Sequence, residues 1–217
     1  MKYQAVIFDL DGTLLNTAAD IAFAMNSVLE RHNLPLHSVT DYHYFIGKGL
    51  ANLVRVSVPE AQRTPALLDG YLAEVMAAYA QSLDDNTKPY SGISDLLNGL
   101  TAKGIRRAIL SNKAHQFMAE TIALHFSPWS FTAVLGARPG IPIKPNPGSA
   151  LEIAELMNLS PEQIVYLGDS DVDMQTATNA GMFAVGAAWG FRHRDELIQS
   201  GAQLVIDAPQ RLLALFE

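Results

Sequence analysis

Short apolar runs that end abruptly in polar residues recur along the chain. The clearest lie at residues 3–8, 107–110 and 164–167, and they are too short for helices and too continuously apolar for strands with one solvated face. Such runs are typical of strands that are buried on both faces of a parallel sheet. Weaker strands are expected at residues 131–135, 183–187 and 204–206.

Amphipathic segments alternate with these runs. In each segment apolar residues recur every three or four positions, as on one face of a helix. We expect helices at residues 93–103, 115–125, 148–158, 172–180, 194–200 and 209–216. The alternation of strand and helix favours an α/β fold with a doubly wound parallel sheet, Rossmann-like in layout.

One long stretch breaks this alternation and shows helical periodicity without a convincing strand. Its expected helices lie at residues 18–32, 49–58 and 60–81. A polar segment with Pro and Gly at residues 84–92 then leads back to the alternating pattern. We therefore divide the chain into an α/β core, residues 1–15 and 85–217, and an inserted helical domain, residues 16–84.

Composition narrows the choice of partners and chemistry. The 15 Lys and Arg against 22 Asp and Glu give a net charge of −7 without a basic tract, which argues against binding to nucleic acid. Cysteine is absent, so disulfides, thiolate metal sites and a cysteine nucleophile are excluded. Asp9 and Asp11 interrupt the N-terminal apolar run too early for a secretory signal or a membrane span. We expect a cytoplasmic protein without membrane attachment, as a monomer or homodimer.

Two carboxylates follow the first expected strand, in the sequence Asp9-Leu10-Asp11-Gly12-Thr13. Residues two apart on extended backbone point to the same side, so both carboxylates can face one reacting group. Gly12 allows a tight turn beside them. For a lone Asp-Gly pair, a turn without chemistry is the alternative.

A second acidic cluster, GDSDVD at residues 168–173, follows the strand expected at residues 164–167. Its carboxylates suit a hard cation such as Mg²⁺. An EF-hand loop is the rival interpretation, but Met174 stands where that loop requires Gly and Ala180 stands where it requires a bidentate Glu. Capping of the following helix explains one of these polar residues but not all of the Asp residues.

Further polar groups stand at the ends of other elements. Ser111-Asn112-Lys113 follows the strand expected at residues 107–110, and Lys144 precedes the helix expected at residues 148–158. Taken alone, a hydroxyl before a helix is usually a cap and a single Lys is usually a solvated charge. In an open parallel sheet, however, ligands bind beyond the carboxyl ends of the strands, so these residues can converge on one site.

The order of these elements resembles the haloacid dehalogenase superfamily. The resemblance rests on DLDGT at residues 9–13, Ser111, Lys144 and GDSDVD at residues 168–173, and it spans nearly the whole chain. The inserted helices resemble that family's helical cap of the first type, and the layout is closest to its phosphoglycolate phosphatase branch. The resemblance implies a phosphoric monoester hydrolase that acts on a small-molecule phosphate ester.

The resemblance also implies roles for the residues that react. Asp9 would be the nucleophile that forms an aspartyl-phosphate, and Asp11 would serve as general acid and then as general base. Lys144 would offset negative charge on the nucleophile and the transferring group. The phosphoryl oxygens would be held by Ser111 and the backbone N–H of Asn112, with Gly12 and Thr13 beside them.

Electrostatics supports a metal in such a site. Four carboxylates and a phosphate dianion outweigh the single charge of Lys144, so a divalent cation is expected, and oxygen ligands favour Mg²⁺. By the resemblance, the metal would be held by the carboxylates of Asp9 and Asp169 and the backbone carbonyl of Asp11. Asp173 would support either the metal or Lys144.

The inserted domain offers a candidate for substrate selection. IGKGL at residues 46–50 resembles the cap loop that closes over the substrate in this branch. We expect Lys48 to contact an anionic group there, such as the carboxylate of 2-phosphoglycolate, and Arg55 is a weaker candidate. An ordinary exposed turn is the alternative, because the loop forms neither a Walker sequence nor a complete GxGxxG motif.

Several other functions fit parts of the pattern. Asp11 favours phosphoryl transfer over carbon–halogen cleavage, since a dehalogenase needs no second acid. A β-phosphoglucomutase-like phosphotransferase and a pyrophosphatase would keep the same motifs. From a different class, a receiver-like phosphoaspartate switch would carry its acceptor on the third strand and would lack the helical insertion.

Overall fold

The computed structural model describes residues 2–81 and 85–217, with a six-stranded parallel sheet at its centre. The strands are β1 (Ala5–Phe8), β4 (Arg106–Ala114), β5 (Ala133–Ala137), β6 (Ile164–Gly168), β7 (Phe183–Ala187) and β8 (Leu204–Ile206). Their order is β5-β4-β1-β6-β7-β8, so the chain winds first to one side of β1 and then to the other. The doubly wound, Rossmann-like fold is therefore confirmed.

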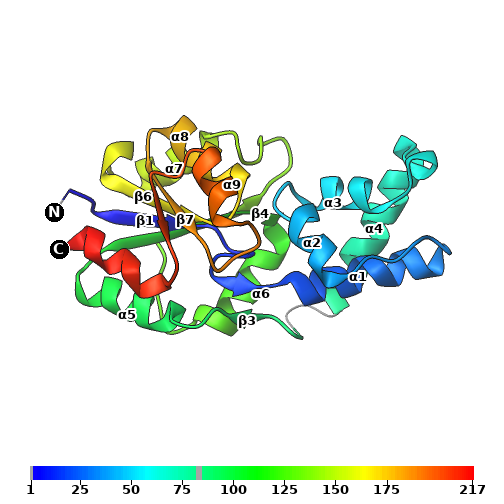
Figure 1. Ribbon diagram of the computed structural model, residues 1–217, viewed down its shortest axis with the longest axis horizontal. Coiled ribbons are helices and arrows are strands. Elements are labelled where there is room, and N and C mark those ends of the chain that lie inside the picture. Colours follow the sequence, from blue (N-terminus) through cyan, green and yellow to red (C-terminus); the bar gives the residue numbers. More distant parts are fainter. Residues whose placement is uncertain (1, 82–84) are drawn as a thin grey trace.

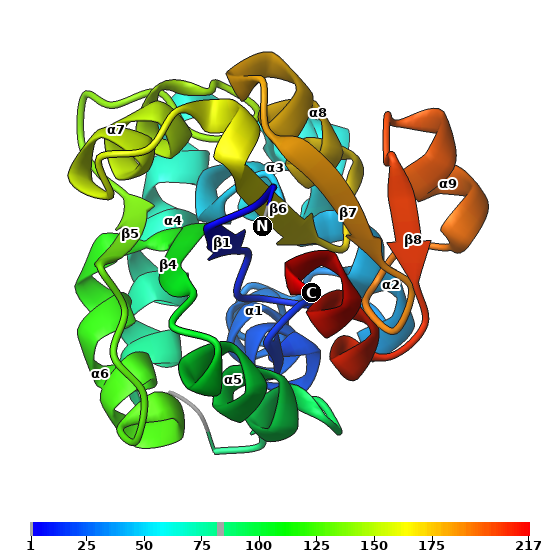
Figure 2. The ribbon, with the colours of Figure 1, turned by 90° about the vertical axis from the view of Figure 1, so that its left-hand side faces the viewer.

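Both faces of the sheet are covered by helices (Figure 2). Val6 and Phe8 of β1 pack into a cluster with α5 (Ile93–Ala102), α6 (His115–Phe126) and the 3₁₀ helix η3 (Pro209–Phe216). Ala5 and Ile7 pack on the opposite face with α7 (Gly148–Leu156), α8 (Asp171–Ala180) and α9 (Arg194–Gln199). Burial of successive residues on both faces explains why these strands are continuously apolar in sequence.

The inserted helices form a cap with an apolar core of its own. It contains α1 (Ala18–Arg31), α2 (Val39–Phe45), α3 (Leu50–Ser57), the 3₁₀ turn η1 (Glu60–Gln62) and α4 (Pro65–Gln81). Figure 1 shows the cap at the end of the molecule opposite the two chain termini. Phe117 and Phe191 of the core pack into the apolar cluster of the cap. The two parts are thus joined by apolar contact as well as by the chain.

Two short strands mark the crossing between core and cap. β2 (Leu15–Asn16) pairs antiparallel with β3 (Lys88–Pro89), beside the start of α1. Asp20 of α1 is buried and accepts hydrogen bonds from the backbone N–H of Asn86 at 3.0 Å and from the hydroxyl of Thr87 at 2.7 Å. One carboxylate therefore fixes the outgoing segment to the returning one. The boundary expected at residues 84 and 85 adjoins residues 82–84, which lie outside the described residues.

Some element boundaries differ from those expected. β4 continues to Ala114, so Ser111 and Asn112 lie within the strand instead of after it. The strand expected at residues 131–135 is shifted to Ala133–Ala137. The helix expected at residues 60–81 is broken and resumes at Pro65, because proline suits the first turn of a helix and cannot continue one from before. The segment expected as a helix at residues 209–216 is 3₁₀ in form.

Helix α2 is absent from the sequence expectations. Its seven residues are too few to show a clear apolar period. The signal that identifies it is the capping box, in which Ser38 accepts from the N–H of Asp41 and the Asp41 carboxylate accepts from the N–H of Ser38. A search for Ser followed three positions later by an acidic residue finds this helix.

Among the described residues, no helix combines the length and the apolar character needed to cross a bilayer. The cytoplasmic location and the oligomeric state stay predictions.

The hydrogen bonds of Asp20 between the two segments that join core and cap lead to a prediction about stability. Asp20→Ala leaves the hydroxyl of Thr87 and the N–H of Asn86 without their buried acceptor. We expect the free energy of unfolding to fall by about 2–4 kcal/mol, because an unsatisfied buried donor loses its full desolvation cost. Urea denaturation measures this loss. Asp69→Ala removes an exposed carboxylate on α4 and serves as the matched control, with an expected change within about 0.5 kcal/mol. Equal stability of the Asp20→Ala variant and the wild type would contradict the assigned contacts.

Candidate active site

Side chains from the carboxyl ends of two neighbouring strands, β1 and β4, meet Lys144 beneath the cap. They surround a cavity of about 60 Å³. Its floor is formed by Asp9 and Asp11 after β1, Ser111, Asn112 and Lys113 on β4, and Lys144 before α7. Cap residues form the opposite wall, with Ile21 and Ala24 from α1, Leu53 from α3, Val75 and Tyr79 from α4, and Ile46, Gly47, Gly49 and Leu50 between α2 and the start of α3. The cavity therefore lies where core and cap face each other.

Lys144 is a buried cation between two buried carboxylates. Its Nζ lies 2.7 Å from Oδ1 of Asp9 and 2.6 Å from Oδ1 of Asp173. Burial raises the pKa of Asp9 and the charge of Asp173 adds to this rise, while Lys144 opposes it. Burial acts to lower the pKa of Lys144, but the two carboxylates outweigh this effect and hold the pKa well above its usual value. Lys144 is thus a permanent positive charge in the site.

Asp173 is fully engaged within the first turn of α8. One carboxylate oxygen, Oδ2, accepts hydrogen bonds from the N–H and the hydroxyl of Ser170, at 3.1 and 2.6 Å. The other oxygen accepts from Lys144. Ser170 is also the N-cap of α8, so the capping expected for one residue of this motif is confirmed. These contacts hold Asp173 as a rigid support for the Lys144 ammonium.

Asp169 is held by two hydrogen bonds and is closely packed between two glycines. Its carboxylate accepts hydrogen bonds from the backbone N–H of Phe191 at 2.7 Å and from the hydroxyl of Thr13 at 3.1 Å. Gly12, with φ of +94°, and Gly190 flank it, and a Cβ on either glycine would lie 2.3 Å from an atom of Asp169. Burial and the charge of Asp173 raise the pKa of Asp169 to about 7, although both hydrogen bonds act to lower it.

The acidic cluster fits a divalent cation. Asp9, Asp169 and Asp173 each offer an oxygen, and these oxygens lie within 4.8 Å of one another. The donors are all oxygen, and the raised pKa values of Asp9 and Asp169 show that Lys144 alone leaves the negative charge under-compensated. Since Asp173 is engaged by Ser170 and Lys144, Asp9 and Asp169 are the better placed ligands. Among the described residues, the carboxylate of Asp11 lies outside this cluster.

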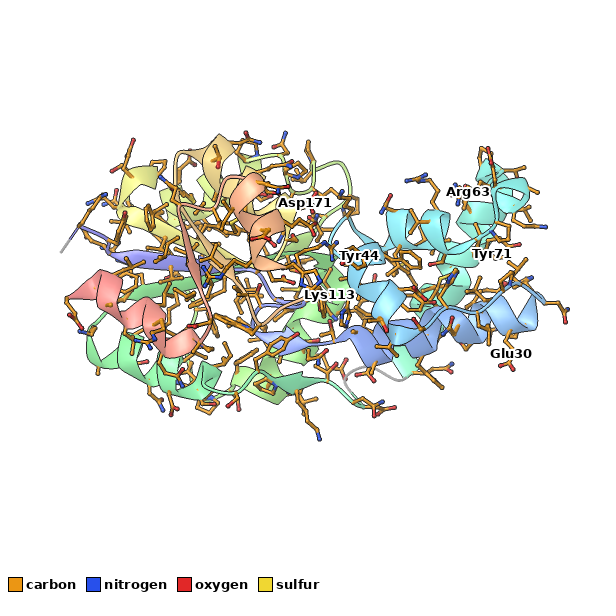
Figure 3. All side chains as sticks on the ribbon, viewed as in Figure 1. Glu30, Tyr44, Arg63, Tyr71, Lys113 and Asp171 are labelled. Atoms are coloured by element: carbon orange, nitrogen blue, oxygen red, sulfur yellow. The ribbon has the colours of Figure 1, made fainter. Side chains whose placement is uncertain are left out.

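Asp11 faces β4 instead. Its Oδ2 accepts from the hydroxyl of Ser111 at 3.4 Å, and its Oδ1 lies 3.6 Å from Nζ of Lys113. Lys113 also donates to the hydroxyl of Tyr79 and lies over the ring of that tyrosine at 4.5 Å. Sequence reasoning assigned no role to Lys113, and its position directly after Ser111 and Asn112 was the available signal. Figure 3 shows Lys113 at the junction of core and cap.

The side chain of Asn112 connects two loops. Its Oδ1 accepts from the backbone N–H of Lys144 at 3.0 Å, and its Nδ2 donates to the carbonyls of Lys144 at 3.1 Å and of Gly47 at 2.8 Å. From the sequence, only the backbone N–H of this residue was expected to contact the substrate. The structure shows that its amide also fixes the backbone of Lys144 and ties it to the cap loop.

The two expected cap contacts lie away from the cavity. Lys48 is half exposed, its Nζ lies 3.1 Å from Oδ2 of Asp171, and its side chain does not line the cavity among the described residues. The guanidinium of Arg55 donates a hydrogen bond to the side-chain oxygen of Asn52 on the surface of α3. Figure 3 places Asp171 on the core side of the junction with the cap. The structure therefore does not bring Lys48 or Arg55 to the other expected site residues.

A loop after β7 links the site to the cap, and sequence reasoning missed its central residue. The buried guanidinium of Arg192 donates to the carbonyls of His43 and, at 3.2 Å, of Ile46 in the cap. The preceding Phe191 stacks on the ring of His43 at 4.9 Å, while its N–H holds Asp169. The same loop therefore orients a site carboxylate and fastens the cap. In the sequence, an Arg that follows Trp-Gly-Phe gives little signal of this role.

Comparison with known proteins agrees with this geometry. Phosphoglycolate phosphatase of Pseudomonas putida is 31% identical over 214 residues, covering 97% of this chain and 78% of that protein. The enzyme of that name from Xylella fastidiosa strain Temecula1 is 31% identical over 211 residues, covering 96% and 91%.

Among solved structures, a protein from Lactobacillus delbrueckii subsp. bulgaricus, provisionally assigned as a phosphoglycolate phosphatase, is 32% identical with a TM-score of 0.93. The match covers 100% of this chain and 99% of the chain from Lactobacillus delbrueckii. The model of the haloacid dehalogenase-like hydrolase family matches residues 6–187, from β1 to the end of β7. With the fold, the cap and the family model in agreement, the chain belongs to the haloacid dehalogenase-like hydrolases.

Proposed function

We propose that this chain is a Mg²⁺-dependent phosphatase that hydrolyses small-molecule phosphomonoesters, with 2-phosphoglycolate as the first candidate substrate. The observation that carries the proposal is the buried carboxylate of Asp9, held by Lys144 on the floor of a covered cavity that Asp11 also lines. The phosphatases named among the relatives support the choice of substrate class.

In the first step a carboxylate oxygen of Asp9 attacks phosphorus, and the bond from phosphorus to the alcohol oxygen breaks. Asp11 enters as the acid and donates its proton to the departing alkoxide, which leaves as a neutral alcohol. Ser111, within 3.4 Å of Asp11, offers its hydroxyl to the phosphoryl oxygens. The products of this step are the alcohol and an aspartyl-phosphate on Asp9.

In the second step water attacks the phosphorus of the aspartyl-phosphate. Asp11, now a carboxylate, accepts a proton from that water, and the bond from phosphorus to the Asp9 oxygen breaks. Inorganic phosphate leaves, and both aspartates regain their starting protonation states. Lys144, held by Asp173, keeps a positive charge next to Asp9 throughout both steps.

Asp9 and Asp169 would hold the metal, together with the backbone carbonyl of Asp11. When bound, Mg²⁺ supplies positive charge that offsets the carboxylates and the phosphate. Thr13 and Phe191 orient Asp169 for this purpose through their hydrogen bonds. The proposed division into a core of residues 1–15 and 85–217 and a cap of residues 16–84 lets the cap exclude water from the cavity.

The first prediction concerns the nucleophile. Asp9→Asn removes the attacking charge without changing the size of the side chain, so phosphate release from 2-phosphoglycolate should fall by at least about 10³-fold. Phosphate release with Mg²⁺ and with a chelator measures this. Asp171→Asn removes a neighbouring carboxylate outside the cavity and is the matched control. Hexose phosphates belong in the same assay, because an isomerised sugar phosphate with little free phosphate would identify a mutase and contradict the proposal.

The second prediction concerns the acid and base. Asp11→Asn should lower kcat by about 10²- to 10⁴-fold for an ester with a poor leaving group such as 2-phosphoglycolate. The loss should be smaller for p-nitrophenyl phosphate, whose leaving group needs little protonation, so that breakdown of the phosphoenzyme limits its rate. Burst and steady-state kinetics on both esters separate the two steps. An equal loss in the first step for both esters would argue against Asp11 as the acid.

The third prediction concerns the metal. Asn at position 169 can still accept from the N–H of Phe191 and can donate to the hydroxyl of Thr13, while it removes one charge from an under-compensated cluster. In EDTA, Asp169→Asn should therefore raise the melting temperature, which corresponds to a gain of about 1 kcal/mol in the free energy of unfolding. The variant should also lose the stabilisation that Mg²⁺ gives the wild type. Thermal unfolding with and without Mg²⁺ measures both effects. A variant that Mg²⁺ stabilises as much as the wild type would contradict the assigned ligand.

A further inference from the structure

A second buried cation faces the cavity, on the side of Asp11. The side chain of Lys113 is 4% exposed, and its Nζ lies 3.6 Å from Oδ1 of Asp11. Among the described residues that line the cavity, Lys113 and Lys144 are the cations, and Lys144 is bound between Asp9 and Asp173. Lys113 is therefore the cation nearest to the group that protonates the leaving oxygen in the proposed function.

The rest of the cavity offers little to a polar alcohol. Its cap wall includes Ile21, Leu53 and Val75, and among the described residues of that wall only Tyr79 carries a polar side-chain group. Buried hydroxyls without partners are costly, so a sugar-like leaving group rich in hydroxyls fits this wall badly.

We infer that Lys113 is a specificity-determining residue that binds a carboxylate on the alcohol part of the substrate, so that the preferred substrates are phosphate esters of small 2-hydroxy acids. The inference rests on the proposed function, because it places the leaving oxygen next to Asp11. In such an ester the carboxylate is attached to the carbon that carries the leaving oxygen. A group at that position lies within reach of an ammonium beside Asp11, and the pair forms charge-assisted hydrogen bonds.

Tyr79 positions the Lys113 ammonium. Its hydroxyl accepts a hydrogen bond from Nζ, and its ring lies under the charge with a separation of 4.5 Å from Nζ to the ring centre. The ring of Tyr79 in turn packs edge-on against Phe117 of the core, with ring centres 5.3 Å apart. Since Tyr79 belongs to α4 of the cap and Lys113 belongs to β4 of the core, the carboxylate-binding position is complete only when the cap is in place.

Lys48 is the competing cation for this role. It is half exposed and paired with Asp171 outside the cavity lining, whereas Lys113 is buried and lines the cavity. A buried ammonium interacts more strongly with an incoming anion than an exposed one, because water screens it less. Substitution of Lys113 and substitution of Lys48 are therefore expected to affect the preference for the carboxylate ester differently.

The test compares two esters that differ only in the acid group. Steady-state kinetics of the Mg²⁺-loaded full chain are measured on 2-phosphoglycolate and on its carboxamide analogue, and the ratio of kcat/KM for the two is taken. The wild type should favour the carboxylate by about 10- to 100-fold, the range expected for hydrogen bonds between charged groups. Lys113→Met should bring the ratio close to one, chiefly by raising KM for 2-phosphoglycolate. Lys113→Arg should retain part of the preference, and Lys48→Met should keep the wild-type ratio.

Each other outcome identifies what fails. A wild type that hydrolyses both esters equally well overturns the inference without the use of any variant, so a variant that misfolds does not leave it open. An equal loss of kcat on both esters in Lys113→Met would assign Lys113 to the positioning of Asp11 and would also overturn the inference. Loss of discrimination in Lys48→Met would give the role to Lys48. No hydrolysis of any ester by the wild type would instead overturn the proposed function itself.

Discussion

Carboxylates that are buried close together require positive charge within contact distance, and in this molecule Lys144 supplies the fixed part of it. The lysine lies between Asp9 and Asp173, and its own backbone is held on both sides by the amide of Asn112. Removing the lysine would leave two buried carboxylates without their shared cation, which is among the most destabilising changes in proteins. The geometry of the whole site depends on this arrangement.

The single positive charge of Lys144 does not balance all of the buried carboxylates around it. The pKa values of Asp9 and Asp169 are raised by burial and by their acidic neighbours. Binding of a cation, or protonation of one carboxylate, therefore stabilises the cluster. A divalent cation held by Asp9 and Asp169 would bring this positive charge. The loop that holds Asp169 through Phe191 also carries Arg192, which fastens the cap, so exclusion of water and orientation of the carboxylates are mechanically connected.

Much of this could be predicted from sequence because it depends on local pattern. Continuous apolar runs predicted buried parallel strands, and the ends of those strands predicted that Asp9, Ser111 and Asp169 would meet. The rest depends on distances that sequence does not contain. Lys113 and Arg192 act through contacts with cap residues, Tyr79 and His43, that are far away in the chain. Lys48 was expected at the substrate because of its loop, but a nearby carboxylate, Asp171, pairs with it at the rim.

The central claim is that Asp9 is phosphorylated and then freed during each turnover. The most direct test is to quench the Mg²⁺-loaded enzyme during hydrolysis of 2-phosphoglycolate, reduce acyl phosphates with borohydride and locate the product by peptide mass spectrometry. The account predicts reduction of Asp9 to homoserine, dependent on substrate, in a sample that also releases inorganic phosphate. Phosphate release with Asp9 left unmodified under these conditions, or a phosphorylated Asp9 that persists with no phosphate released, would contradict it.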